Sequence, residues 1–189
     1  MTSNTISTRQ NADAASILAA IERVARAQQE GDSTELVWSA FERSLSEVFG
    51  QRLFTVLAFD APSSRLCRLH SNRLDINPIG GVKRVTQSVW AGKVLRRGEM
   101  FIGSTREDIQ SVFSEYEVLW SIGCESVLNI PVRKDGVTLG TMNLLGEAHL
   151  YDHADLNIAH VFAQLAVAPL LDQVQKLRDF TDPDVMEQV

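Results

Sequence analysis

The stretch from Glu125 to Leu145, ESVLNIPVRKDGVTLGTMNLL, decides the fold. Two apolar runs with several β-branched residues flank a short polar tip that contains Asp135 and Gly136. An Asp-Gly pair between apolar runs indicates a β-hairpin, because glycine accepts the positive φ that tight hairpin turns require. A hairpin as apolar as this one is expected at the centre of a sheet.

Helical periodicity marks both ends of the chain. Residues 12–30 and 152–180 carry apolar side chains at helical spacing. The narrow apolar stripe of each segment is typical of a helix that packs against another helix. Pro169 lies inside the second segment and has no backbone N–H, so we expect a kink near Leu165. Asp152 is placed to cap the start of this C-terminal helix.

The middle of the chain alternates between short apolar runs and further helical segments. The strand expected at 65–70 alternates imperfectly, since its apolar members are Leu66 and Leu69, and this is typical of a strand near a sheet edge. Paired strands with helices at both chain ends favour an α+β domain with an antiparallel sheet. The elements expected between the two ends are helices at 32–49, 87–97 and 106–121, strands at 53–59, 65–70 and 100–102, and a long loop at 72–85.

Length and composition set the class of protein. A chain of 189 residues with 44% hydrophobic and 22% charged residues is an ordinary globular domain. The polar ends, residues 1–11 and 181–189, are expected to be a disordered N-terminus and a frayed tail. The net charge of −6 argues against general nucleic-acid binding. Two cysteines without a signal-peptide pattern indicate the cytoplasm, and no apolar run is long enough to span a membrane.

The element order and the hairpin together resemble the GAF family of small-molecule-binding sensory domains, over about Leu36 to Leu171. Ser126 to Val132, a charged turn, and Leu139 to Leu144 are similar to the family's pattern S-x-L-x-V-P-L, turn, I-G-x-L-x-L. The resemblance implies a GAF/PAS-like central antiparallel β-sheet of five to six strands. It places the terminal helices on one face, and pocket loops with short helices on the other. Residues 12–180 are then a single GAF domain, whose terminal helices are expected to form a homodimeric bundle.

Departures from the family's better-known members narrow the function. Bilin-binding members attach their chromophore through a Cys-His pair, but neither Cys67 nor Cys124 precedes a histidine, so no bilin or haem cofactor is expected. Of the cyclic-nucleotide signature only Tyr151 and Asp155 have counterparts here. Members that reduce methionine sulfoxide use several clustered cysteines. Here Cys124 alone lies near the corresponding strand, and it is only a weak catalytic candidate.

Basic residues gather in the segment from Arg65 to Arg97, which holds eight Lys and Arg residues and one acid, a net charge of +7. In a GAF fold this segment supplies part of the pocket lid, so we expect it to attract a small anionic ligand. The alternative is a solvated surface that faces an acidic partner or subunit. The residues expected to bind the ligand are Arg84, Trp90, Phe101, Tyr116, Trp120, Ser126 and Asn143; each aromatic among them is equally consistent with plain core packing.

The sequence carries no motif for catalysis or for a metal. His149 and His153 are four residues apart, but His149 precedes the expected helix cap, so no metal site is expected. Neither a Gly-rich phosphate loop nor a nucleophile elbow is present. The sequence therefore favours a sensory module that binds a small anion over an enzyme. Two alternatives stay open: a thiol-dependent redox enzyme resembling the free methionine sulfoxide reductase branch, and an interaction protein whose pocket is filled by side chains.

Overall fold

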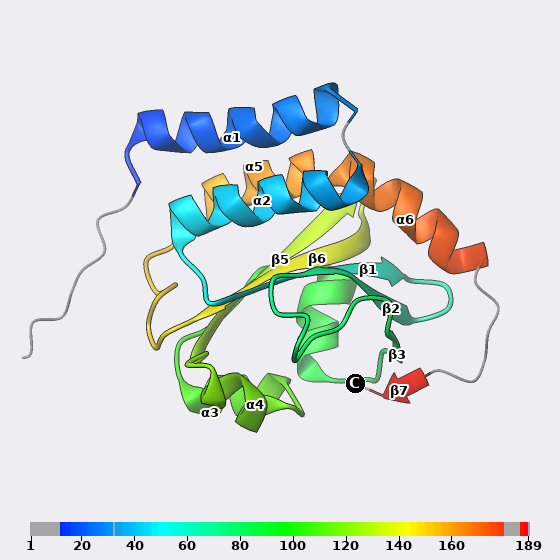
Figure 1. Cartoon of the computed structure of the whole chain (residues 1–189). Coiled ribbons are helices and arrows are strands. Elements are labelled where there is room, and N and C mark those ends of the chain that lie inside the picture. Colours follow the sequence, from blue (N-terminus) through cyan, green and yellow to red (C-terminus); the bar gives the residue numbers. More distant parts are fainter. Residues whose placement is uncertain (1–11, 32, 180–185, 189) are drawn as a thin grey trace, which may run out of the picture.

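The predicted hairpin lies inside a seven-stranded sheet in the computed structural model, which describes residues 12–31, 33–179 and 186–188 (Figure 1). Strands β5 (Ser126–Lys134) and β6 (Val137–Gly146) are joined by a tight turn with Asp135 at φ 51° and Gly136 at φ 79°. Both central turn residues thus have the positive φ that the Asp-Gly pair predicted. The hairpin pairs through β5 with β4 (Phe101–Gly103) and through β6 with β1 (Leu53–Asp60).

The remaining strands extend the sheet beyond β1. Strand β2 (Arg65–Ser71) pairs with β1, and β3 (Val82–Arg84) pairs with β2, so that six strands from β4 to β3 form an antiparallel sheet as expected. The expectation of a loop throughout 72–85 was wrong at β3. A short strand β7 (Met186–Gln188) lies parallel to β3, where a frayed tail was expected. The expected disordered residues 1–11 lie outside the described residues, as do 181–185 and 189.

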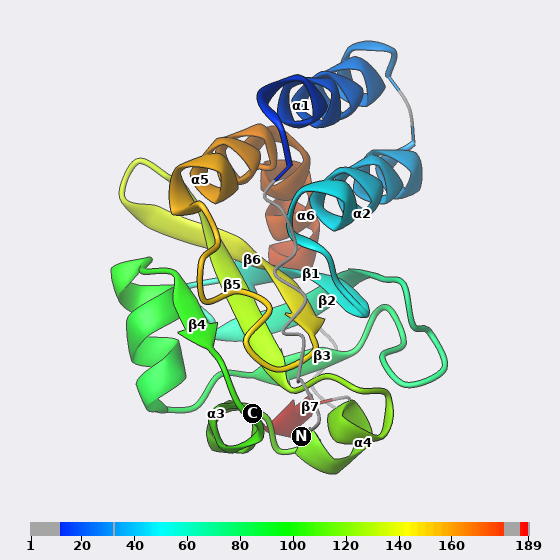
Figure 2. The same cartoon turned by 90° about the vertical axis from the view of Figure 1, so that its left-hand side faces the viewer.

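One face of the sheet is covered by the terminal helices (Figures 1 and 2). Helices α2 (Thr34–Phe49), α5 (Leu156–Leu165) and α6 (Val167–Asp179) pack on the sheet, and α1 (Ala14–Gln29) lies outside them on α2 and α5. Their core is built from alternate strand residues and large helical side chains, including Trp38, Phe41, Leu45, Phe54, Val56, Leu128, Ile130, Met142, Leu144 and Phe162. The α+β architecture expected from the sequence is confirmed.

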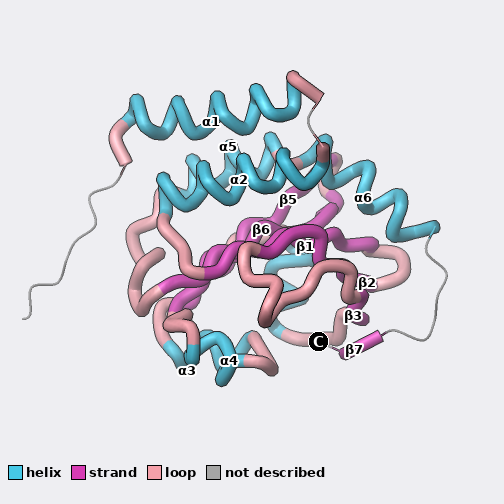
Figure 3. Tube along the Cα trace, in the orientation of Figure 1, coloured by secondary structure: helices cyan, strands magenta, loops and turns pink. Residues whose placement is uncertain are grey.

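The opposite face is covered by short helices and loops (Figure 3). They are the π-helical segment η1 (Ala91–Arg97), α3 (Arg106–Val112) and α4 (Tyr116–Ser121). The single helix expected at 106–121 was wrong, because Phe113 is extended at φ −112° and ψ 124°. The break allows Ile109 of α3 and Leu119 of α4 to be buried in the same apolar cluster. Among the helices described, none is long and apolar enough to cross a membrane.

The C-terminal helix is interrupted where Pro169 predicted a kink. Helix α5 ends at Leu165 and α6 begins at Val167. Pro169 has no N–H for the carbonyl of Leu165, four residues earlier. That carbonyl instead accepts a hydrogen bond from Nε2 of Gln28 on α1, at 3.1 Å. The start of α5 also differs from expectation, since Asp155 caps it whereas Asp152 binds His149 at 2.8 Å.

Replacing Gln28 by alanine should therefore loosen α1 from the helical layer. Without the amide, the partly buried Leu165 carbonyl loses its partner, at a cost of about 1 kcal/mol. The free energy of unfolding, measured by urea titration, is expected to fall by that amount. The control is Gln29→Ala, because Gln29 is the exposed neighbour on the same helix end. Equal destabilisation by both substitutions would show that the Gln28 contact contributes nothing specific.

Candidate functional site

A cavity lies between the sheet and its cover of short helices and loops. Its volume is about 70 Å³, on the order of five water-sized positions. Most of the wall is apolar, and polar side chains reach it from several elements, which is the usual design of a small-ligand site. The lining residues are Leu53, Thr55, Leu57, Leu66, Arg68, Asn77, Gly81, Lys83, Trp90, Val112, Phe113, Glu115, Leu119, Asn143 and Leu145.

A row of buried polar side chains crosses the sheet beneath the cavity. Asn129, Asn143 and Thr55 are directly opposite one another on β5, β6 and β1. Asn129 Nδ2 donates to Asn143 Oδ1 at 2.7 Å, and Asn143 Nδ2 donates to Thr55 Oγ1 at 3.2 Å. The indole Nε1 of Trp90 donates to Asn129 Oδ1 at 2.9 Å. The polar row therefore fixes the ring of Trp90 as one wall of the cavity.

The polar row separates two apolar clusters on this face of the sheet. One cluster gathers under η1 and includes Phe59, Leu66, Ala91, Val94 and Leu95. The other gathers under α3 and α4 and includes Leu53, Ile109, Leu119, Cys124, Val127 and Leu145. The cavity is lined by Leu53, Leu119 and Leu145 of one cluster and Leu66 of the other, so its floor is polar in the middle and apolar on both sides.

A β-bulge in β2 puts Arg68 and His70 on opposite faces of the sheet. Arg68 is opposite Leu57 and His70 is opposite Val56, so Leu69 is the extra residue between them. In a regular strand, residues two apart share a face. The bulge instead places Arg68 on the cavity face and His70 on the helical face. Bulges commonly re-aim side chains in this way beside binding sites.

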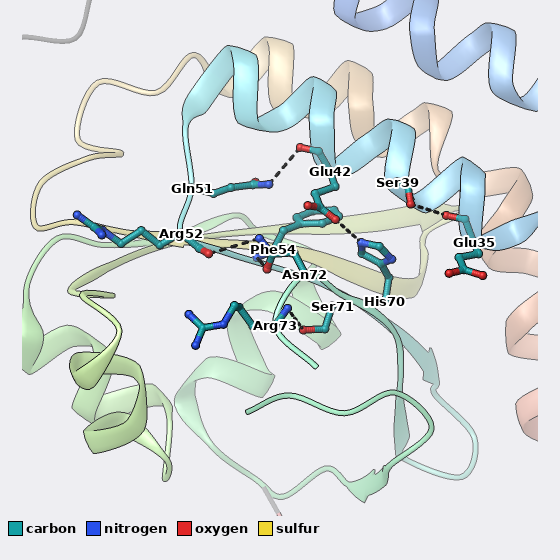
Figure 4. A network of polar contacts seen from close by, with 10 residues as sticks. All are labelled: Glu35, Ser39, Glu42, Gln51, Arg52, Phe54, His70, Ser71, Asn72 and Arg73. Atoms are coloured by element: carbon teal, nitrogen blue, oxygen red, sulfur yellow. Dashed lines mark hydrogen bonds and ion pairs between the residues drawn. The ribbon is translucent and has the colours of Figure 1, made fainter. Parts of the chain in front are cut away.

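On the helical face, the same strand is tied to α2 (Figure 4). His70 Nε2 and Glu42 Oε2 are 2.7 Å apart, and His70 is 7% exposed. The carbonyl of Glu42 also accepts from Gln51 Nε2 at 3.1 Å. One residue beyond Ser71, Asn72 accepts from the backbone N–H of Phe54 at 2.8 Å. These contacts fix β2 against both α2 and β1 next to the bulge.

Three charged side chains line the cavity. Lys83 on β3 and Glu115 at the start of α4 form an ion pair, with Lys83 Nζ 3.4 Å from Glu115 Oε1. Burial works to raise the pKa of Glu115, but the Lys83 ammonium and a hydrogen bond from Ser114 outweigh it and hold that pKa below its usual value. Arg68 donates from Nη1 to the carbonyl of Pro78 at 3.2 Å. The wall thus offers two cations and one ionised carboxylate.

No family model matches the chain, and no curated protein is significantly similar to it. Solved structures are similar over most of its length. A GAF domain of an Acinetobacter phosphoenolpyruvate-protein phosphotransferase is 11% identical and has a TM-score of 0.65, with 87% of this chain and 98% of that chain covered. The chain has the GAF fold.

Two further structures with this fold come from proteins of different kinds. The GAF domain of a two-component sensor histidine kinase from Bacillus halodurans is 16% identical, with 74% of this chain and 92% of that chain covered and a TM-score of 0.57. The free methionine-R-sulfoxide reductase of Neisseria meningitidis, solved with its substrate, is 13% identical, with 88% and 96% covered and a TM-score of 0.58. At such identities the likeness carries the fold alone.

The GAF fold brings only part of the expected ligand site together. Trp90 and Asn143 line the cavity. Phe101, Tyr116 and Trp120 pack against the neighbouring clusters, outside the lining. Ligand contact by these five residues stays a prediction.

Ser126 and Arg84 lie apart from the cavity lining for a reason of strand geometry. Side chains alternate along a strand, so Ser126 shares the helical face with Leu128, and its hydroxyl donates to the carbonyl of Glu147 at 2.6 Å. Arg84 is exposed, whereas its neighbour Lys83 lines the cavity. The basic segment thus contributes Arg68 and Lys83 rather than Arg84, and Glu115 completes the charged wall.

The two cysteines lie in different environments. Cys124 is fully buried, and burial raises the pKa of its thiol to about 11, although the guanidinium groups of Arg52 and Arg73 oppose the shift. Cys67 is half-buried, and burial also raises its pKa. Since the thiolate is the reactive form of cysteine, Cys124 is held in its unreactive state at neutral pH.

We therefore expect Cys124 to resist labelling in the folded protein. In a Cys67→Ser variant, Cys124 carries the only thiol. At about pH 8 this thiol should react with a thiol reagent at least about 100-fold more slowly than a free cysteine does. Full reactivity should return in concentrated guanidinium chloride. A native rate equal to the denatured rate would contradict the buried, protonated thiol.

Proposed function

We propose that this chain is a sensory module that binds a small anionic molecule with an apolar body in the cavity between strands β1, β2 and β6 and their cover of short helices and loops. The observation that carries the proposal is the cavity wall, where Arg68 and Lys83 lie above a polar floor flanked by leucine side chains. A cationic wall in a partly desolvated site attracts an anion more strongly than it would in water. The apolar flanks then accommodate the ligand's body.

Binding should appear as thermal stabilisation. A ligand at 100 times its Kd stabilises the folded state by about 2.7 kcal/mol, which shifts the melting temperature measurably. The screen consists of small carboxylates with aliphatic bodies, including amino acids, together with nucleotides and purine or pyrimidine metabolites. Lys83→Met should abolish the shift.

The matched control for that substitution is Arg84→Met on the same strand, which should leave the shift unchanged because Arg84 lies outside the lining. A screen without any stabilising anion would overturn the proposal. If Arg84→Met loses binding and Lys83→Met retains it, the ligand binds on the exposed side of β3 and the proposed cavity site is wrong.

We further propose that the module is a homodimer that associates through α1. The apolar stripe of α6 is used within the domain, where Leu170, Val174 and Leu177 are buried against the sheet. Among the exposed large apolar side chains described for the helical layer, Leu18 on α1, the outermost helix, is the most exposed at 67%, ahead of Leu36 on α2 and Val161 on α5. The proposed dimer contact therefore involves the N-terminal helix alone, whereas both terminal helices were expected from the sequence to take part.

Sedimentation at micromolar concentration should show a dimer, and Leu18→Glu should convert it to monomer by placing a charge in the apolar contact. The control is Leu74→Glu. Leu74 is 58% exposed and follows β2, away from α1, so a charge there should leave the dimer intact. A monomeric wild type, or equal effects of both substitutions, would contradict dimerisation through α1.

The two alternatives have less support. A thiol-dependent reductase needs an activated cysteine, whereas burial raises the pKa of Cys124 to about 11. The fold similarity to the Neisseria reductase does not supply the missing thiolate. An interaction protein with a filled pocket would leave no cavity between the sheet and its cover, where one of about 70 Å³ is present.

A further inference from the structure

The charged wall of the cavity holds a carboxylate as well as cations. Lys83 and Glu115 come from different elements, β3 and the start of α4, and both line the same cavity. Their side chains are 23% and 34% exposed, so the pair is partly shielded from water. A plain anion that approaches Lys83 also approaches the negative charge of Glu115. In a partly desolvated site that repulsion offsets much of the attraction.

Both members of the pair have further hydrogen-bonding capacity. Glu115 Oε1 faces Lys83, and Oε2 accepts from Ser114 Oγ at 2.8 Å. An ionised carboxylate accepts about four hydrogen bonds, and an ammonium donates three. A ligand can therefore bind to Lys83 and Glu115 together without breaking the ion pair between them.

We propose that the ligand is a small zwitterion, an α-amino acid with an aliphatic side chain, and that Glu115 selects it over the corresponding plain carboxylate. The ligand's carboxylate accepts from Lys83, and its ammonium donates to Glu115. The four charges then alternate in sign around a ring, and no charge is left without a partner. The aliphatic side chain lies against Leu57, Leu66 and Leu119, which line the cavity.

This inference rests on the proposed anion site and adds the ammonium position to it. The pKa of Glu115, held below its usual value, keeps the carboxylate ionised at neutral pH, as the ammonium contact requires. The amides of Asn77 and Asn143 also line the cavity but carry no net charge, so Glu115 is the one negative side chain among the described lining residues that can pair with an ammonium group. Selection for the ammonium group therefore depends on Glu115.

The test uses matched pairs of ligands measured by calorimetry on the full chain: L-leucine with 4-methylpentanoate, and L-valine with 3-methylbutanoate. In wild type the amino acid should bind at least about tenfold more tightly than its partner. In Glu115→Gln the preference should disappear, because the amino acid loses its ammonium partner and the plain carboxylate loses a repelling charge. Glu117→Gln is the matched control, since Glu117 is an exposed acid on the same helix and should retain the wild-type ratio.

The outcomes separate this inference from the anion site itself. If wild type binds both members of each pair equally, the proposed preference for a zwitterion is wrong, but the proposed anion site is still supported. An unchanged preference in Glu115→Gln would overturn the role of Glu115. If neither the amino acids nor the carboxylates bind, the anion site fails with them. Because the wild-type ratio needs no substitution, the inference can be tested even if Glu115→Gln is unstable, which its melting curve without ligand would reveal.

Discussion

The candidate site depends on the buried hydrogen bonds that connect Trp90, Asn129, Asn143 and Thr55. Buried amides are costly unless they are paired, so this row stabilises only one register of β5, β6 and β1. A one-residue slip would move each amide to the helical face, among Leu128, Ile130 and Met142. The same bonds hold an aromatic wall over the floor. The polar row therefore specifies both the sheet and the cavity above it.

The bulge in β2 allows one strand to serve two layers. Arg68 reaches the cavity, while His70, two residues later, contacts Glu42 of α2. In a regular strand these two side chains would compete for the same face. The extra residue, Leu69, packs against the helical core instead. As a result, the strand that supplies a cation to the cavity is also the strand fixed to the helical layer by a 2.7 Å contact.

Local signals predicted the features that local chemistry determines. Asp135-Gly136 predicted the hairpin, and Pro169 predicted the break between α5 and α6, because positive φ and a missing N–H act within a few residues. Asn143 was found as a polar residue on an apolar strand. Arg68 and Lys83 were expected only as members of the basic segment, because strand register and the three-residue strand β3 decide which of its side chains reach the cavity. Glu115 was missed, because its position depends on a break in a helix that has no clear sequence signal. The imperfect alternation around Leu69 was the visible trace of the bulge, and it was interpreted as an edge.

The cavity's charges follow from how the loops and short helices close over the sheet. Between the sheet and the helical layer, the described residues pack into a mainly apolar core, whereas the cavity lies on the opposite face of the sheet. There the extended conformation of Phe113 ends α3 and begins a second short helix with Glu115 at its start. In a continuous helix through 106–121, Glu115 would lie inside the helix and would not be the helix start beside Lys83. The break between α3 and α4 therefore has two effects. It allows Ile109 and Leu119 to be buried together, and it places the Glu115 carboxylate beside the Lys83 ammonium in the cavity wall.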